Sequence, residues 1–326
     1  MKAAVITRYG SPDVIQILDA PKPTAAADEV LVRVHAATVT RTDCGELRAH
    51  PYFSRLFYGL RRPNRTIFGL DFAGEVEAVG DAALALKPGD RVFGMCPSRK
   101  NGAQAEYVAV PQRLVAIMPA GARFDEAVVC EGAFYANSIL KRIDLKPDQS
   151  LLIYGASGAI GTALVQLAKS AGAAVTAVVA TRHLELVKSL GSDRVIDYSV
   201  EDFTRIGERF DFVVDVVGKT SFFSCRRLLK PNGIYAATDL GAYWQNLMLA
   251  LWSWIARRNR VVIATPGRSD GFVGFLKGRM EAGQFRAVID RKYPLAAIAD
   301  AYRYVETGQK VGIVAIDVAE ESAQVA

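Results

Sequence analysis

The stretch that decides the fold is Ser150-Leu-Leu-Ile-Tyr-Gly-Ala-Ser-Gly-Ala-Ile-Gly-Thr-Ala-Leu-Val-Gln-Leu-Ala-Lys169. An apolar segment breaks on three glycines, each three residues after the last, and an apolar repeat typical of a helix follows at once. In such a strand–turn–helix, the first glycine allows the tight turn, the second lets the backbone approach a phosphate, and the third lets helix and strand pack closely. The stretch therefore predicts a site for the pyrophosphate of a dinucleotide, with the helix start facing the anion. The residues expected to contact it are Gly155, Ser157, Gly158, Ala159 and Ile160.

Further apolar segments after this helix predict a doubly wound parallel sheet. The expected strands are Val175–Val179, Arg194–Asp197, Phe210–Val217 and Gly233–Thr238. In such sheets, ligands bind at the carboxyl ends of the strands. We therefore expect Tyr198, Gly218 and Thr238 to lie at the cofactor, although each residue type also serves in turns and helix caps.

The residues after the second strand bear on which nucleotide is bound. An NAD-specific site has an acidic residue about 20 residues beyond the glycines, where it binds the ribose 2′-hydroxyl. Here Thr181 and Arg182 stand in that place, and no acid precedes Glu185. Because a hydroxyl and a guanidinium suit a 2′-phosphate, this pattern predicts NADPH. The alternative is that Arg182 is an ordinary exposed arginine.

The chain of 326 residues is longer than one such domain, so a second core is expected. Short alternating segments punctuated by Gly and Pro predict a small antiparallel barrel. Its expected strands are Lys2–Ile6, Val30–Val34, Glu75–Val79, Arg91–Met95 and Ala105–Val110, completed by a strand at Phe285–Ile289, a helix at Leu295–Thr307 and a strand at Val311–Ile316. The expected domains are residues 1–122 with 265–326 and an inserted nucleotide domain at 123–264, with substrate in a cleft between them.

Four more runs occur in the order typical of one superfamily. They are Gly69-Leu-Asp-Phe-Ala-Gly-Glu-Val-Glu-Ala-Val-Gly80, Lys87-Pro-Gly-Asp-Arg-Val-Phe93, Ala105-Glu-Tyr-Val108 and Glu185-Leu-Val-Lys-Ser-Leu-Gly191. With the glycine turn, they make the chain resemble the medium-chain dehydrogenase/reductase superfamily, in its zinc-free quinone oxidoreductase branch similar to ζ-crystallin. The resemblance implies an α/β fold in which a doubly wound parallel Rossmann sheet is inserted into a GroES-like β-barrel catalytic domain. It also implies NADPH-dependent reduction of quinones, enones or related carbonyl compounds, usually by a homodimer.

Zinc-dependent alcohol dehydrogenases share this fold, but their ligand pattern is incomplete here. They carry Cys where Thr40 stands and Gly-His-Glu where Gly69-Leu70-Asp71 stands. The four cysteines are scattered, without a C-x-x-C pair, so we expect no metal site. Free cysteines and the absence of a signal-peptide pattern suit the cytoplasm. Cys130 is expected to be buried apolar filling.

Without a metal, hydrogen-bond donors must stabilise the charge that develops on a reduced carbonyl. The resemblance places Thr40 where many zinc-free relatives carry Asn, and Tyr52 near the proton-donating Tyr of the enoyl reductases. Tyr52 and Tyr58 are equally suited to shaping an aromatic pocket wall. Asp43 is expected to be a strand or cap partner rather than a base.

A Trp-rich segment, residues 243–260, departs from the family pattern. Helical spacing places Trp244, Leu247, Met248, Leu251, Trp252 and Ile255 on one face, before a basic cluster. The segment is too short to span a bilayer. Three interpretations stay open, namely a lid over an apolar substrate, a membrane-surface helix and a subunit contact. Its place after the fifth strand favours the lid.

The sequence thus predicts a zinc-independent oxidoreductase that passes a hydride from NADPH to an enone, quinone or related carbonyl substrate. The alternatives are NAD(P)-dependent alcohol–aldehyde interconversion and an NADPH-binding redox sensor without turnover. A formal net charge of +6 is modest for 326 residues, so no nucleic-acid partner is expected.

Overall fold

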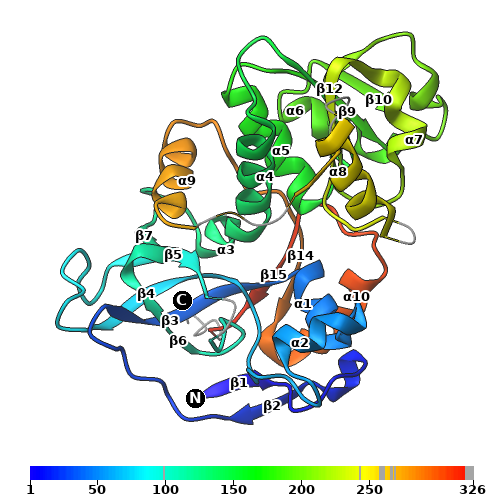
Figure 1. The fold of residues 1–326 in the computed structure, drawn as a ribbon. Helices are drawn as coiled ribbons and strands as arrows, with labels where there is room; N and C mark the ends of the chain where they lie inside the picture. Colours follow the sequence, from blue (N-terminus) through cyan, green and yellow to red (C-terminus); the bar gives the residue numbers. More distant parts are fainter. Residues whose placement is uncertain (98–99, 242–243, 257–260, 265–266, 268, 320–326) are drawn as a thin grey trace. The chain divides into compact units, whose positions relative to one another are not determined.

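The computed structural model describes residues 1–326 except 98–99, 242–243, 257–260, 265–266, 268 and 320–326 (Figure 1). The chain divides into two compact units, one of Met1–Glu131 with Ser269–Ala326 and one of Gly132–Arg268. We call them unit 1 and unit 2. Unit 2 is inserted into unit 1 along the chain, and the limits expected from the sequence, 123 and 264, lie nine residues earlier at the first junction and four residues earlier at the second. Among the described residues, no helix is both long and apolar enough to cross a membrane.

Unit 2 contains the predicted parallel sheet. Its strands are β8 (Ser150–Tyr154), β9 (Ala174–Val179), β10 (Arg194–Asp197), β11 (Phe210–Asp215), β12 (Leu229–Ala237) and β13 (Val261–Ile263). Their order is β10-β9-β8-β11-β12-β13, and every neighbouring pair is parallel. The order therefore reverses between β8 and β11, which is where doubly wound sheets bind nucleotides. The sixth strand, β13, was not predicted, because three residues carry too little pattern.

Helices connect these strands. They are α4 (Cys130–Ile143), which begins at the junction, α5 (Ala159–Ser170), α6 (Leu184–Ser189), α7 (Phe222–Cys225) and α8 (Gln245–Ala256), with short 3-10 turns at Thr181–His183, Phe203–Arg205 and Arg226–Leu228. The helix predicted after the glycine turn is confirmed as α5, and Gly172 turns the chain after it with φ of +82°. Leu164 and Leu167 on α5 are buried, as their helical spacing predicts.

Unit 1 is built on a mixed sheet and a separate two-stranded sheet. The strands are β1 (Lys2–Val5), β2 (Gln16–Asp19), β3 (Glu29–Val39), β4 (Asp71–Val79), β5 (Arg91–Met95), β6 (Tyr107–Pro111), β7 (Val115–Ile117), β14 (Ile289–Pro294) and β15 (Ile313–Asp317). The larger sheet has the order β14-β15-β3-β4-β5-β7, and β6 also pairs with β3. One edge of β3 is shared, since residues 29–33 pair with β6 and residues 36–39 pair with β15.

Short helices complete unit 1. They are α1 (Arg41–Arg48), α2 (Arg55–Tyr58), α3 (Phe124–Ala127), α9 (Phe272–Glu281) and α10 (Ile298–Glu306), with 3-10 turns at Pro12–Val14, Tyr52–Ser54, Gln112–Leu114 and Leu295–Ala297. The predicted helix at residues 295–307 is confirmed. Ile298, Tyr302 and Val305 on α10 are buried in the same core as Val314 and Ile316 of β15.

Two expectations for unit 1 need correction. The strand predicted at Phe285–Ile289 is wrong, because the strand there is β14 and begins only at Ile289. Its partner β15 cannot extend further, since Gly312 turns the chain with φ of +59° and a Cβ there would lie 2.0 Å from the carbonyl oxygen of Val288. The sheet is also not purely antiparallel, because β14 pairs with β15 in the parallel sense.

Candidate functional site

The three glycines after β8 have the geometry that a phosphate-binding turn requires. Gly155 has φ of +85°, and a Cβ added at Gly161 would lie 2.2 Å from the carbonyl oxygen of Gly155. A Cβ at Gly158 would meet only that same oxygen, in an ordinary contact at 3.8 Å, so Gly158 is uncrowded. Gly158 caps the start of α5 without a side-chain hydrogen bond to the helix N–H groups. The turn therefore offers both the room and the donors that a pyrophosphate needs.

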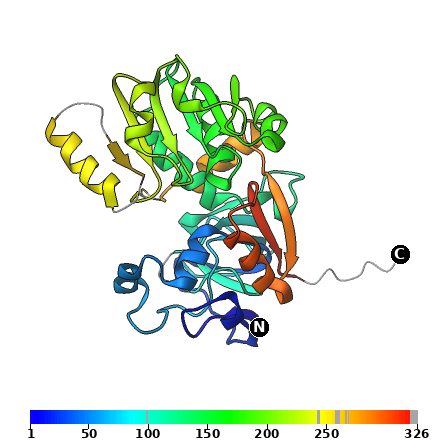
Figure 2. The same ribbon diagram turned by 90° about the vertical axis from the view of Figure 1, so that its right-hand side faces the viewer.

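The other cofactor candidates follow the strands of the same sheet. Tyr198 comes directly after β10, Gly218 lies beyond β11 and Thr238 comes directly after β12. Because these strands are parallel, the three residues lie along the edge that also carries the glycine turn. Figure 2 shows the ribbon of this sheet in a second view. The ring of Tyr198 is half exposed and meets the ring of Tyr154 edge-on, with centroids 6.1 Å apart.

One buried carboxylate holds the loop after β11 in place. Asp215 accepts hydrogen bonds from the backbone N–H groups of Val217 at 2.9 Å, Gly218 at 2.8 Å and Thr220 at 3.0 Å. Burial raises the pKa of Asp215, while these three donors oppose the rise. The sequence analysis missed this role, although an Asp that ends an apolar strand is a signal for it.

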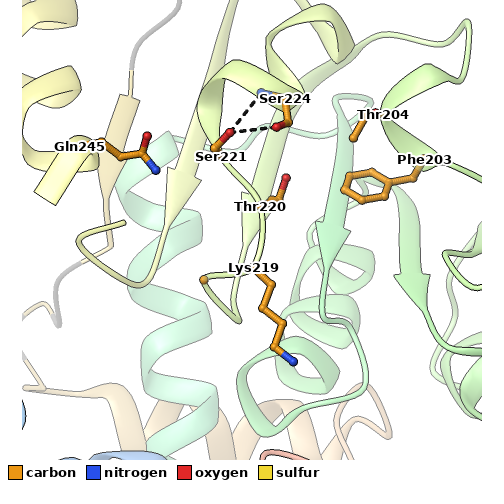
Figure 3. Close-up of a pocket in the computed structure, with 8 residues that line it drawn as sticks. Phe203, Thr204, Lys219, Thr220, Ser221, Ser224 and Gln245 are labelled. Atoms are coloured by element: carbon orange, nitrogen blue, oxygen red, sulfur yellow. Dashed lines mark hydrogen bonds between the residues drawn. The ribbon is translucent and has the colours of Figure 1, made fainter. Parts of the chain in front are cut away.

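A pocket opens beside this loop. It is lined by Phe203, Thr204, Gly218, Lys219, Thr220, Ser221, Ser224 and Gln245. Figure 3 shows Lys219 extending away from Ser221 and Ser224, whose hydroxyl oxygens lie 2.9 Å apart. Gly218 thus borders the pocket as well as the strand edge, and Lys219 is the cation among the lining residues.

The residues expected at the ribose 2′ position have partners of their own. Thr181 lies beside Asp197, the last residue of β10, and its hydroxyl and backbone N–H lower the pKa of the Asp197 carboxyl. Arg182 is exposed, and its Nε donates to Nε2 of His183 at 3.0 Å. From the sequence, an acid is expected only in the stretch directly after β9. Asp197 lies further along the chain, at the end of β10, and the neighbouring strand brings it to Thr181.

In unit 1, Thr40 and Asp43 form the N-terminal cap of α1. The Thr40 hydroxyl accepts from the N–H of Asp43 at 3.2 Å, and Asp43 Oδ2 accepts from the N–H of Thr40 at 2.8 Å. Asp43 is completely buried, and its Oδ1 accepts from the N–H of Gly69 at 3.1 Å. Asp43 is thus a cap partner, as expected.

Tyr52 lies on the 3-10 turn before α2 and is 74% exposed. Its ring packs edge-on to His50, with centroids 6.4 Å apart, and the guanidinium of Arg55 lies 5.5 Å from its centre. Within the described part of the chain, no hydrogen bond is found for its hydroxyl. Among the two candidate hydroxyls, that of Tyr52 is therefore the one free to donate.

Two buried acids lie near α1 and were not singled out as functional from the sequence. Asp71 Oδ1 accepts from the backbone N–H of Glu131 at 2.7 Å, and Glu131 Oε1 accepts from the hydroxyl of Thr42 at 2.6 Å. Burial raises the pKa of both carboxyls, that of Asp71 well above its ordinary value and with a further rise from the charge of Glu131. In the sequence, Glu131 could have been recognised as an acidic residue at the start of an apolar helix.

The positions of the zinc ligands in the alcohol dehydrogenases hold other side chains. Thr40 is buried. Cys130, which is not one of these positions, is buried as expected, and burial raises the pKa of its thiol well above its ordinary value. Leu70 offers no donor atom. Over the residues that the structure describes, no three or more His, Cys, Asp or Glu side chains are grouped so as to hold a metal ion.

The Trp-rich segment forms α8, and its predicted apolar face is exposed. Met248, Leu251 and Trp252 are 71%, 63% and 56% exposed, whereas Asn246 and Ser253 on the opposite face are buried. Ser253 Oγ accepts from the N–H of Val261 at 3.1 Å, which ties α8 to β13. The basic cluster at 257–260, and residue 243, lie outside the described residues.

Comparison with known proteins gives consistent matches. Residues 26–120 match the family model "Alcohol dehydrogenase GroES-like domain", and residues 190–316 match "Zinc-binding dehydrogenase". The chain is 32% identical to 2-methylene-furan-3-one reductase of Solanum lycopersicum and 30% identical to the chloroplastic NADPH-dependent alkenal/one oxidoreductase of Arabidopsis thaliana. Each of these matches covers 97% of this chain and 79% of the relative.

Solved structures show the same fold. The quinone oxidoreductase from Coxiella burnetii superposes with a TM-score of 0.84 at 24% identity, over 98% of this chain and 99% of that one. The CurK enoyl reductase superposes with a TM-score of 0.81 at 21% identity, over 97% of this chain and 98% of that one.

Proposed function

The chain belongs to the medium-chain dehydrogenase/reductase superfamily as a quinone-oxidoreductase-like oxidoreductase, and we propose that it reduces enones, quinones or related carbonyl compounds with NADPH and without zinc. The glycine turn carries this proposal. Gly155 has a positive φ and is crowded by the Val217 side chain, Gly161 is crowded by backbone, and Gly158 is uncrowded, so the turn fits a pyrophosphate. The names of the two plant relatives support the enone class and, for the Arabidopsis protein, NADPH.

The residues of unit 2 that would hold the dinucleotide lie along one sheet edge. Gly155, Ser157, Gly158, Ala159 and Ile160 would contact the pyrophosphate through the turn and the start of α5. Tyr198 would lie against the adenosine, and Gly218 and Thr238 would lie further along the edge, toward the nicotinamide. These roles are proposed because the three residues follow β10, β11 and β12. When bound, the dinucleotide supplies the hydride.

The charges at the expected 2′-phosphate position are of both signs. Thr181 and Arg182 offer a hydroxyl and a cation, but Asp197 adds a carboxylate beside Thr181. An exposed guanidinium can turn toward a phosphate and bind it with paired donors. We therefore propose that Arg182 leaves His183 and provides the preference for NADPH.

In unit 1, we propose that Tyr52 donates the proton that the reduced substrate takes up. A reduced enone needs a proton at carbon or oxygen, and the free hydroxyl of Tyr52 can donate one. Thr40 then holds α1 in place rather than contacting substrate, because its hydroxyl is committed to the cap. Zinc independence rests on the side chains at two ligand positions, Thr40 and Leu70. We also propose that the protein is a homodimer and is located in the cytoplasm.

A screen of cofactor oxidation tests the function. The purified chain is mixed with NADPH or NADH and with a series of enones, quinones and aldehydes, and absorbance of the reduced cofactor is followed. The proposal expects oxidation of NADPH with at least one enone or quinone. Oxidation with aldehydes alone would indicate alcohol–aldehyde interconversion, and binding of NADPH without any turnover would indicate a redox sensor.

A further inference from the structure

The segment that follows α1 in unit 1 exposes a group of large apolar side chains. Leu56 and Phe57 on α2 are 74% and 67% exposed, and Leu60 just beyond it is 67% exposed. Arg61 and Arg62 follow and are also exposed. We call these five residues the arginine–apolar patch. Figure 1 labels α2, the helix that carries Leu56 and Phe57. Single exposed apolar residues are normal, but a contiguous group of them marks a candidate contact surface.

The patch is held in shape by its own turn. Gly59 has φ of +121°, and a Cβ there would lie 2.0 Å from the carbonyl oxygen of Arg62. The carbonyl oxygen of Gly59 itself accepts a hydrogen bond from the hydroxyl of Tyr9 at 2.7 Å. The carbonyl oxygen of Tyr58 accepts one from the N–H of Asn64 at 2.7 Å. The turn is therefore tied to the body of unit 1, and its apolar side chains point outward from a fixed backbone.

The charged side chains of the stretch that carries the patch have one sign. The stretch 47–70 contains five arginines and no Asp or Glu. Arg48 and Arg65 form ion pairs with acids outside this stretch, and Arg55 lies over two aromatic rings. For the two arginines of the patch, no ion pair is found among the residues that the structure describes. The patch therefore presents apolar surface beside two arginines that form no ion pair with any of the described residues.

We propose that the arginine–apolar patch binds the surface of a membrane that contains anionic lipids. Aromatic and aliphatic side chains beside arginines are the composition of segments that insert shallowly at the level of the headgroups. The arginines would be attracted by the negative surface potential of the lipids. A second copy of the chain is a poorer occupant, because a two-fold contact places the patch against itself and brings like charges together without an acid between them.

Vesicle co-sedimentation of the full chain tests this proposal. The vesicles are phosphatidylcholine alone, or phosphatidylcholine mixed with phosphatidylglycerol, at low and at high salt. We expect binding to the mixed vesicles that weakens with salt, because exposed charges are screened. The substitutions Arg61→Gln and Arg62→Gln together should lower this binding about tenfold or more, and Leu56→Ser with Phe57→Ser should lower it at either salt.

Matched variants keep the result interpretable. Arg61→Lys with Arg62→Lys retains the charge and should retain binding. Arg142→Gln with Arg209→Gln removes two exposed arginines of unit 2 and should bind like the parent. Circular dichroism and thermal unfolding of each variant report whether it folds.

Three outcomes would overturn the proposal. The first is a parent protein that does not bind the mixed vesicles. The second is an equal loss of vesicle binding in the unit 2 control, which would mean that the net charge of the protein alone attracts it to the lipids. The third is an arginine pair variant that binds vesicles normally but loses a dimer seen in analytical ultracentrifugation, which would assign the patch to a second copy. None of these outcomes depends on enzymatic activity, so failure here and failure of the proposed function are distinguishable.

Discussion

The hydroxyl of Thr40 donates a hydrogen bond of 2.8 Å to Asp43 Oδ2, a carboxylate oxygen that is completely buried. A hydroxyl held this way is part of the scaffold of α1. The donor role that the family resemblance assigns near this position then falls to another residue, and Tyr52 is the candidate whose hydroxyl has no such commitment.

The first prediction separates these two hydroxyls. Tyr52→Phe should lower kcat by roughly 10²–10⁴-fold, the usual effect of losing a general acid, and should leave NADPH affinity intact. Thr40→Val should instead cost about 1 kcal/mol of stability through loss of the cap and leave kcat near that of the parent. Steady-state kinetics and urea unfolding of both variants check this. If both turn over like the parent, neither hydroxyl carries the reaction.

The second prediction concerns cofactor choice. Arg182→Ala should weaken NADPH binding by roughly 1.5–3 kcal/mol, typical of a hydrogen bond to a charged group, and barely change NADH binding. Asp197→Asn should shift the preference the other way, toward NADPH, because it removes a carboxylate near the expected phosphate. Fluorescence titration with both cofactors measures these changes. Equal losses for NADPH and NADH in Arg182→Ala would reject the assignment.

The third prediction concerns metal. With Thr40 and Leu70 at two ligand positions, the purified protein should contain no stoichiometric zinc and should keep its activity in a chelator. Elemental analysis and assays before and after chelation provide the check. One equivalent of zinc that is removed together with the activity would show the proposal of zinc independence to be wrong.

The fourth prediction follows from the buried carboxyl of Asp71. Burial raises its pKa in the folded chain well above the ordinary 3.8. Its contribution to the free energy of unfolding is therefore complete below about pH 4 and is lost as the pH rises through the folded-state pKa. Asp71→Asn should flatten this loss, by at most about 1.4 kcal/mol per pH unit.

Urea unfolding between about pH 5 and pH 8 measures the effect of Asp71→Asn on this pH dependence. The exposed Asp81, changed to Asn, serves as the control and should follow the parent. Identical pH profiles for Asp71→Asn and the parent would mean that this carboxyl does not govern the dependence.

The fifth prediction distinguishes the three interpretations of α8. Trp252→Ser should fold normally, because the side chain is exposed. If α8 covers substrate, this change should raise KM for bulky apolar substrates more than for small ones. Unchanged kinetics with a loss of vesicle binding would favour a membrane-surface helix, and a change in sedimentation coefficient would favour a subunit contact.

Much of unit 2 could be predicted because its strands are continuous apolar runs, and the glycines mark the turn between strand and helix. The strand at Arg194–Asp197 matches β10 at both ends. Interactions between segments far apart in sequence could not be predicted in the same way. The approach of Asp197 to Thr181 depends on the order of strands in the sheet, and the contact of Asp71 with Glu131 joins the start of β4 to the start of α4.

The orientation of α8 shows a different limit. Its apolar spacing identified the helix and its face, but hydrophobic periodicity alone implies burial of that face. In the structure, Asn246 and Ser253 face the protein instead. Their hydrogen bonds, to Asp239 and Val261, decide the orientation. Hydrogen bonds between a polar side chain and the backbone of another segment leave no periodic pattern in the sequence, so they could not be predicted from it.

The shared edge of β3 makes the order of synthesis matter for this chain. All strands of unit 2 lie between residues 150 and 263, so its sheet is complete in the emerging chain before β14 and β15 exist. The second half of β3 leads directly into Thr40 and α1, and its partner β15 is the last of the described strands to be synthesised. The part of unit 1 that carries the proposed chemistry therefore gains its pairing with β15 after the other described strands have been made. A chain cut short before β15 would lose turnover while its nucleotide-binding sheet remained whole.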